Sequence, residues 1–364
     1  MADREALMSF PYLQLDEQYT VGPWIITPLS KMKAEWRSTI LGIKCQQLLR
    51  ALKGLDGEPV EDPTVVVRRT SHPEPPSGDE RLAEQEGLKL AVEFALLRLN
   101  ATTVKWTAEN ASFHVFFIDP LEGQFVTQRG GIIRQWTTGL FLDDPSLAVP
   151  PPEDLVSFGV AKLDAYVLEA AYRVTSRGLL SSSKVEGDMT SAIHWFGKAW
   201  NNSRSWADSD RLIFFRTSLE ALAGTHKSSA QAPALDQIYA AGISSWGVSG
   251  LLGTLDPQKY ERIDGRGNKY YHSPFEHWLW FLADQRNRVV HDGMAPVLRY
   301  SEPGSPFQGH LLGIAGRVAA ELITIRLSQA GYPFAIMSDA KREEARALAA
   351  SGTPVTMIKQ VPLI

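Results

Sequence analysis

One ten-residue stretch, Asp284 to Gly293, combines the side chains that cleavage of an RNA phosphodiester requires. Arg286 and Arg288 supply permanent cations whose forked donors suit a phosphate group. His291 supplies an imidazole that titrates near neutral pH. Such an imidazole can take the proton of a 2′-hydroxyl or protonate a leaving 5′-oxygen, while the arginine stabilises charge on a phosphorane-like transition state. The stretch therefore indicates RNA cleavage without a metal ion.

The spacing of these residues limits how they can work together. On a regular helix Arg286 and His291 lie ~140° apart, so they do not share a face. Arg288 and His291, three residues apart, do share one. Either the helix loosens before His291, or Arg286 and His291 converge only when two copies of the segment face each other across a two-fold axis. The sequence leaves both alternatives open.

The same residues also allow interpretations without catalysis. An arginine and a histidine at a helix end often bond the last carbonyls and favour the helix dipole there. Arg288 is either a second phosphate contact or a solvated surface arginine. Glu220 lies in the middle of an apolar helix, where a buried charge is normally paired. We expect it to pair with Arg216 or Arg286, or to tune an active site.

The elements that must position this stretch are helical. Pro274 favours a first helical turn, and the helix that it begins is expected to run to about Val290. Residues 151–335 are predicted to form an all-α bundle without a clear strand. Its other predicted helices show apolar residues at helical spacing and cover residues 155–174, 190–200, 208–224, 232–243 and 311–327. Residues 336–364 are expected to form a C-terminal helix and tail.

Residues 1–150 are predicted to form a mixed α/β domain with a regulatory or sensing role. Runs of β-branched and aromatic residues predict strands at 21–26, 64–68 and 114–118, with a meander in 124–142. A helix is expected over 84–99. Consecutive prolines at Pro150, Pro151 and Pro152 predict a stiff connector and hence the domain boundary. The predicted fold class is thus an α+β domain followed by an all-α helical bundle.

The net charge argues against one class of protein, the general nucleic-acid coat. The 364 residues carry a net charge of −4, from 37 basic and 41 acidic residues. Residues 1–150 hold 15 of the basic and 20 of the acidic ones, so their net charge is −5 and the remainder carries +1. Proteins that coat nucleic acid are strongly basic because phosphate neutralisation supplies their affinity. A general nucleic-acid coat is therefore excluded, but a local RNA site is not.

Cys45, the single cysteine, cannot form an intrachain disulfide and fits a reducing cytosol. The chain lacks the start of a signal peptide, and no apolar run approaches the ~18 residues that span a bilayer. We therefore expect a cytoplasmic protein without a membrane partner. His272 and His277 stand at i and i+5 with Pro274 between them, unlike helical metal ligands at i and i+4. We expect no metal and no cofactor.

The order Arg-Asn-x-x-x-His-x-Gly at a helix end resembles the HEPN superfamily. Arg286, Asn287 and His291 match its hallmark, an arginine followed after four to six residues by a histidine, with a polar residue after the arginine. Upstream, the segments 193–200 and 214–222 look like earlier helices of the Apea-like HEPN branch, which often carries an Ala/Ser-Leu-Glu-Ala-Leu core. The resemblance covers roughly residues 155–330.

This resemblance implies a homodimer whose paired motifs form a cleft that cuts RNA without metal. By carry-over, His291 is the general base or acid, Arg286 the phosphate-binding cation, and Asn287 the residue that positions the substrate or the histidine. Arg288 would bind substrate, with Glu220 and Arg216 in support. Members of the superfamily act as toxins and in antiphage defence and abortive infection.

Two other hypotheses remain beside the endoribonuclease. Some HEPN domains are inactive, so the helical half could serve only for dimerisation or partner binding. Alternatively, the acidic residues 1–150 could bind an antitoxin or a phage-derived trigger and hold the site inactive until it arrives.

Overall fold

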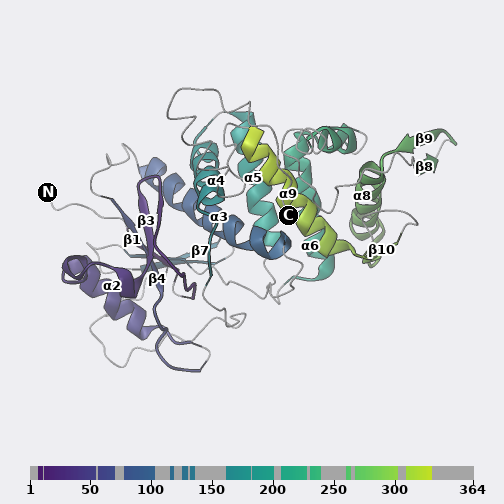
Figure 1. Cartoon of the computed structure of the whole chain (residues 1–364). Helices are drawn as coiled ribbons and strands as arrows, with labels where there is room; N and C mark the ends of the chain where they lie inside the picture. Colours follow the sequence, from purple (N-terminus) through teal and green to yellow (C-terminus); the bar gives the residue numbers. More distant parts are fainter. Residues whose placement is uncertain are drawn as a thin grey trace. The chain divides into compact units, whose positions relative to one another are not determined.

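The computed structural model describes two compact units (Figure 1). The described residues are 7–10, 12–54, 56–69, 78–102, 115–118, 125–129, 132–135, 161–181, 183–200, 206–227, 230–238, 260–263, 267–301 and 309–329. The proline-rich boundary at 150–152 and the predicted C-terminal helix and tail at 336–364 lie outside them. Both predictions therefore remain predictions.

A seven-stranded antiparallel sheet, in the order β2-β3-β4-β1-β5-β6-β7, forms the described β-structure of the first unit. Its strands are β1 (Leu7–Phe10), β2 (Tyr19–Val21), β3 (Trp24–Pro28), β4 (Thr64–Arg68), β5 (Val115–Ile118), β6 (Phe125–Arg129) and β7 (Ile132–Gln135). The strands predicted at 64–68 and 114–118 and the meander after them are confirmed within the described residues. The central strand β1 was not predicted.

The single strand predicted over 21–26 is instead a tight hairpin. Val21 of β2 pairs with Trp24 of β3, so Gly22 and Pro23 form a two-residue turn. Gly22 adopts a φ of 50°, a left-handed conformation that glycine tolerates. The turn residues break a run of apolar side chains that otherwise has the pattern of one strand.

Four described helices of the first unit accompany this sheet, in the chain order α1 (Ala34–Arg37), α2 (Ile40–Ala51), α3 (Gly78–Thr102) and α4 (Ala165–Gly178).

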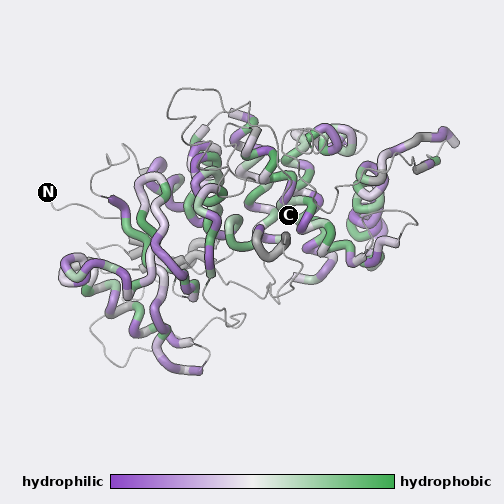
Figure 2. Tube along the Cα trace, viewed as in Figure 1, coloured by the Kyte–Doolittle hydropathy of each residue, from purple (hydrophilic) through white to green (hydrophobic). Residues whose placement is uncertain are grey.

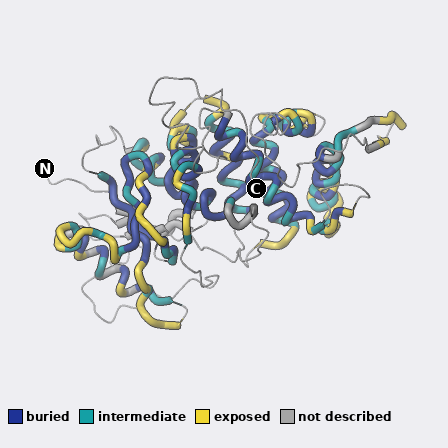
Figure 3. Tube along the Cα trace, in the orientation of Figure 1, coloured by how far each residue is buried: buried dark blue, intermediate teal, exposed yellow. Residues whose placement is uncertain are grey.

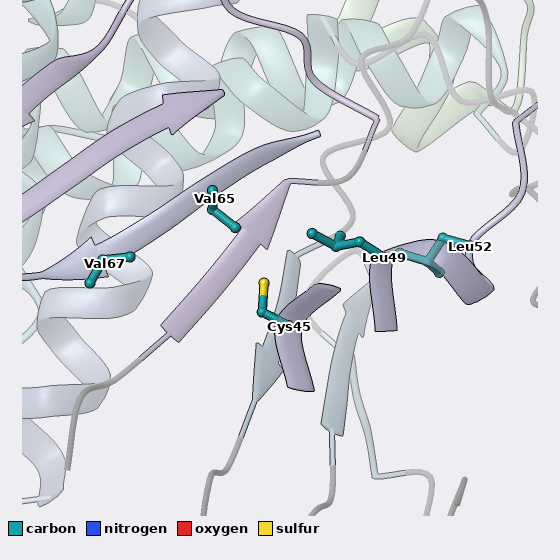
Figure 4. Packing of buried hydrophobic residues seen from close by; sticks show 5 residues of the cluster. All are labelled: Cys45, Leu49, Leu52, Val65 and Val67. Atoms are coloured by element: carbon teal, nitrogen blue, oxygen red, sulfur yellow. The ribbon is translucent and has the colours of Figure 1, made fainter. Parts of the chain in front are cut away.

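A small hydrophobic cluster contains the single cysteine of the chain. It joins Cys45, Leu49 and Leu52 to Val65 and Val67 of β4 (Figure 4). Burial raises the pKa of the Cys45 thiol to about 12 because the charged thiolate is desolvated. Cys45 is therefore a core residue and not a reactive thiol.

Helix α4 belongs to the first unit and not, as predicted, to the helical half. The Thr175 hydroxyl donates to the Gly87 carbonyl of α3 at 2.7 Å, and the Gly22 amide donates to Glu169 at 3.0 Å. A Cβ on Gly87 would lie 2.6 Å from the backbone nitrogen of Ser176, so α3 and α4 cross in close contact. Helix α4 is thus part of the first compact unit, whereas the boundary predicted near residue 150 lies outside the described residues.

The second unit is mainly helical. It contains α5 (Lys184–Trp200), α6 (Asp208–Ala223), a helix over residues 230–238, α8 (Pro274–Asp292) and α9 (Leu311–Gln329). Two short hairpins accompany them, β8 (Tyr260–Ile263) with β9 (Lys269–His272) and β10 (Arg299–Tyr300) with β11 (Gly309–His310). The helices were predicted and the hairpins were not, because two to four residues are too few to show a strand pattern.

The core of this unit lies between α5, α6 and α9. Most residues of α9 are buried, as the dark blue stretches of Figure 3 illustrate. Hydrophobic and hydrophilic residues alternate along the neighbouring helices (Figure 2), so those helices bury one side only. The Ser218 hydroxyl of α6 donates to the Ala192 carbonyl of α5 at 2.8 Å, which satisfies a buried polar group. No described helix is long and apolar enough to cross a membrane.

The close contact of α5 and α9 yields a test. A Cβ on Gly316 of α9 would lie 2.1 Å from the ring of Trp200, which is buried. We expect Gly316→Ala to lower the free energy of unfolding by about 1–3 kcal/mol through overpacking, as measured by urea denaturation. A Cβ on Gly187 of α5 would meet no other atom within 4 Å. Gly187→Ala should therefore raise stability by about 0.5–1 kcal/mol. Equal effects of the two substitutions would contradict this packing.

Candidate functional site

Helix α8 carries the Arg-His motif and is fixed at both ends by its own sequence. Ser273 caps its first turn by accepting the Glu276 amide at 3.1 Å, and Pro274 occupies the first helical position. Gly293 ends the helix in a left-handed conformation with φ of 63°. The amide of Met294 donates to the Arg288 carbonyl at 3.0 Å and so closes the last turn. The helix predicted from Pro274 to about Val290 is thus confirmed and extends to Asp292.

Because α8 continues through His291, the motif does not loosen before the histidine. Arg286 is half-buried, whereas His291 lies exposed in the last turn. Five residues of regular helix separate the two side chains by ~140° around the axis. Of the two geometries that the sequence left open, the one in which a single helix loosens is not observed. One copy of the chain does not bring Arg286 and His291 to one face of α8.

The buried side of α8 is held by apolar and polar contacts. Phe275, Trp278 and Leu282 are fully buried. The side-chain oxygen of Gln285, which is also buried, accepts the Val297 amide at 2.8 Å. The segment after Gly293 therefore folds back along the helix and restrains the end that carries the motif.

Arg216 of α6, a helix that packs against α8, forms a buried charged contact. Its Nε lies 3.3 Å from Glu220 Oε1, with side-chain exposures of 4% and 18%. Burial lowers the pKa of Arg216, and the charge of Glu220 opposes that effect. Arg286 lowers the same pKa further and Asp284 raises it, which brings both α8 side chains into the electrostatic surroundings of Arg216. Glu220 thus pairs with Arg216, the first of its two predicted partners.

The second carboxylate oxygen of Glu220 faces a residue that the sequence analysis did not single out. His226 Nδ1 lies 3.6 Å from Glu220 Oε2, and the His226 side chain is 93% exposed. Helix α6 ends at Gly224 with φ of 66°, so the chain turns and returns His226 to the last turns of the helix. One sequence feature could have pointed to His226. It is the glycine that ends the helix after the Leu-Glu-Ala-Leu segment, with the histidine two residues later.

Asn287 and Arg288 occupy the turns next to Arg286. Arg286 Nη1 donates to Asn287 Oδ1 at 3.3 Å, so the amide restrains the guanidinium. Arg288 is half-buried, and its Nε is a buried atom without a hydrogen-bond partner among the described groups. A buried donor of this kind gains free energy when it meets an acceptor. Arg288 therefore differs from the fully solvated surface arginine that the sequence also allowed.

The histidines at the start of α8 make other contacts. His272 Nδ1 lies 3.3 Å from Glu276 Oε2, and His277 Nδ1 lies 2.9 Å from the Tyr300 hydroxyl. Within the described ranges, no group of three or more His, Cys, Asp or Glu side chains is arranged to hold a metal ion.

Comparison of the chain with protein-family models, with curated proteins and with solved structures gave no match.

The Arg216–Glu220 contact makes a prediction about stability. Glu220→Ala removes the carboxylate that lies 3.3 Å from a buried guanidinium, so the free energy of unfolding should fall by about 2–4 kcal/mol. Lys184 and Asp188 of α5 form a pair of the same i,i+4 spacing that is largely exposed. Asp188→Ala should change stability by no more than about 0.5 kcal/mol. Urea denaturation of both variants measures the difference, and equal losses would show that burial does not matter for the Arg216 pair.

Proposed function

We propose that this protein is a metal-independent endoribonuclease of HEPN type that acts as a homodimer. The observation that supports the proposal most is the end of α8, where Arg286 and Asn287 precede an exposed His291 and a left-handed Gly293 closes the helix. This is the order and position of the motif that HEPN endoribonucleases use. We further propose a bacterial toxin or antiphage effector that acts in the cytoplasm.

The proposed reaction needs only the side chains at this helix end. The 2′-oxygen of the substrate attacks the adjacent phosphorus, and His291 acts as general base or general acid in that step. The guanidinium of Arg286 stabilises the charge that develops on the phosphoryl oxygens. Asn287 contacts Arg286 at 3.3 Å, and the Arg288 guanidinium would supply a second cation for the phosphate.

The regular geometry of α8 supports the dimeric form of this proposal. Arg286 and His291 diverge by ~140° on one continuous helix. A two-fold axis next to the helix end brings each motif against its copy, so that Arg286 of one protomer and His291 of its partner can face the same phosphate. The first unit would then serve as the binding site of an antitoxin or a phage-derived trigger.

A non-catalytic module is the second candidate. The position of His291 in the last turn of α8 favours it, because a histidine there also interacts with the helix dipole. In that case the helical unit would dimerise or bind a partner protein without cutting RNA.

Cleavage assays on purified full-length protein separate these candidates. We expect RNA cleavage that survives EDTA and falls by about 10²–10⁴-fold in His291→Ala, since that substitution removes a general acid–base group. Arg286→Ala should fall by a similar factor because the transition-state charge loses its cation. His310→Ala, which alters another exposed histidine, should cut like the wild type. Undiminished cleavage by His291→Ala would contradict the assigned chemistry, and an uncut panel of RNAs together with a bound partner protein would favour the second candidate.

A further inference from the structure

Large apolar side chains are exposed at the helix end that carries the motif. Val290 of α8 is 44% exposed, and Met294, which directly follows the closing Gly293, is 51% exposed. The Met294 amide donates to the Arg288 carbonyl at 3.0 Å, so its backbone is held against the last turn of α8. Grouped apolar side chains that remain in water are typical of a surface that contacts a ligand or a partner.

Val290 lies between the arginine and the histidine of the motif around the axis of α8. On a regular helix with ~100° per residue, Val290 is ~40° from Arg286 and ~100° from His291, within the ~140° that separates the two. Asn287, which is also exposed, falls in the same sector, ~40° from His291. A substrate that is bound by Arg286 or by His291 on this side of the helix therefore lies next to Val290.

The charges and polar groups around this side chain suit an RNA strand. The six residues from Arg286 to His291 contain two arginines and no carboxylate, so a phosphate at Arg286 meets no acidic residue of this segment. Val290 follows Arg286 by one helical turn, ~6 Å along the axis. The oxygen of Asn287 accepts Arg286 Nη1, which leaves its amide nitrogen to donate to the polar edge of a base.

The extent of this apolar surface favours a nucleobase over a second protein chain. A stable protein interface buries ~800 Å² on each partner. Even an aromatic side chain buries at most ~250 Å², so two smaller side chains that are about half exposed provide only a small part of such an interface. The apolar face of one planar base, in contrast, can be covered by two side chains.

We propose that Val290, together with Met294, binds the nucleobase beside the scissile phosphate of the RNA substrate. This inference rests on the proposed function. Arg286 and His291 perform the cleavage, and Val290 takes no part in proton transfer. An apolar contact with a base is made in the ground state and in the transition state alike, so its loss raises KM and leaves kcat nearly unchanged.

Substrates that lack one nucleobase test this contact directly. The probes are an oligoribonucleotide that spans a mapped cleavage site and two copies of it in which the nucleotide on one or the other side of the cleaved bond is abasic. Both copies keep every phosphate and every 2′-hydroxyl. On the parent substrate, we expect Val290→Ala to raise KM about three- to tenfold, since apolar contact area is lost, with kcat within about twofold of the wild type. On one of the two abasic substrates, Val290→Ala and the wild type should have the same KM, because the base that Val290 contacts is missing.

Matched variants keep the result interpretable. Val185 at the start of α5 is 58% exposed, so Val185→Ala removes the same atoms elsewhere in the unit and should leave KM unchanged on all three substrates. Met294→Ala should raise KM on the parent substrate and lose this effect on the same abasic substrate as Val290→Ala. Because Val290 is exposed, Val290→Ala should melt at the wild-type temperature and keep the wild-type oligomeric state in light scattering.

Each outcome bears on the proposal. An unchanged KM of Val290→Ala on the parent substrate, with a cleaving wild type, would overturn the role of Val290 and leave the proposed function in place. An equal rise in KM on the parent and on both abasic substrates would overturn it too, because no base would then be contacted. Dissociation of the Val290→Ala dimer would assign the surface to a second copy of the chain and overturn the nucleobase contact. A wild type that cuts no RNA would overturn the proposed function itself and this role with it.

Discussion

The ion pair between Arg216 and Glu220 is the contact on which the candidate site depends. A guanidinium that is 4% exposed must be paired, because an isolated charge in the protein interior costs several kcal/mol. Glu220 meets that requirement and is thereby fixed at the end of α6. The other oxygen of the same carboxylate lies 3.6 Å from His226 Nδ1, and the charges of Asp284 and Arg286 on α8 act on the pKa of Arg216. The pair belongs to a helix that packs against α8.

The surrounding fold supplies the rigidity that such a site needs. Helix α9 is apolar on most sides and fills the centre of the second unit, against α5 and α6. Helix α8 is defined by the Ser273 cap at one end and by Gly293 at the other. Its exposed last turn is held by Gln285, which binds the returning backbone at Val297. Side chains on regular helices of this kind keep their geometry better than side chains on loops.

The parts of this account that could be predicted from sequence are local ones. The start of α8 follows from Ser273 and Pro274 and its end from Gly293, because caps and stops act within one turn. The strand β4 is equally clear from its run of valines. The hairpin at Gly22 and the membership of α4 in the first unit depend on pairing and packing between distant segments, which periodicity does not report. His226 reaches Glu220 through the turn at Gly224, and helical periodicity does not report such a turn. The sequence left open whether Glu220 pairs with Arg286 or with Arg216, and the structure shows the pair with Arg216, four residues earlier on the same helix.

The central claim is a phosphodiester cleavage performed by arginine and imidazole side chains without a metal ion. The chemical identity of the new RNA ends tests it most directly, by mass spectrometry of fragments produced in the presence of EDTA. We expect a 2′,3′-cyclic phosphate on one fragment and a 5′-hydroxyl on the other, because the substrate's own 2′-oxygen is the nucleophile. Fragments with 3′-hydroxyl and 5′-phosphate ends, which require an attacking water, would contradict it.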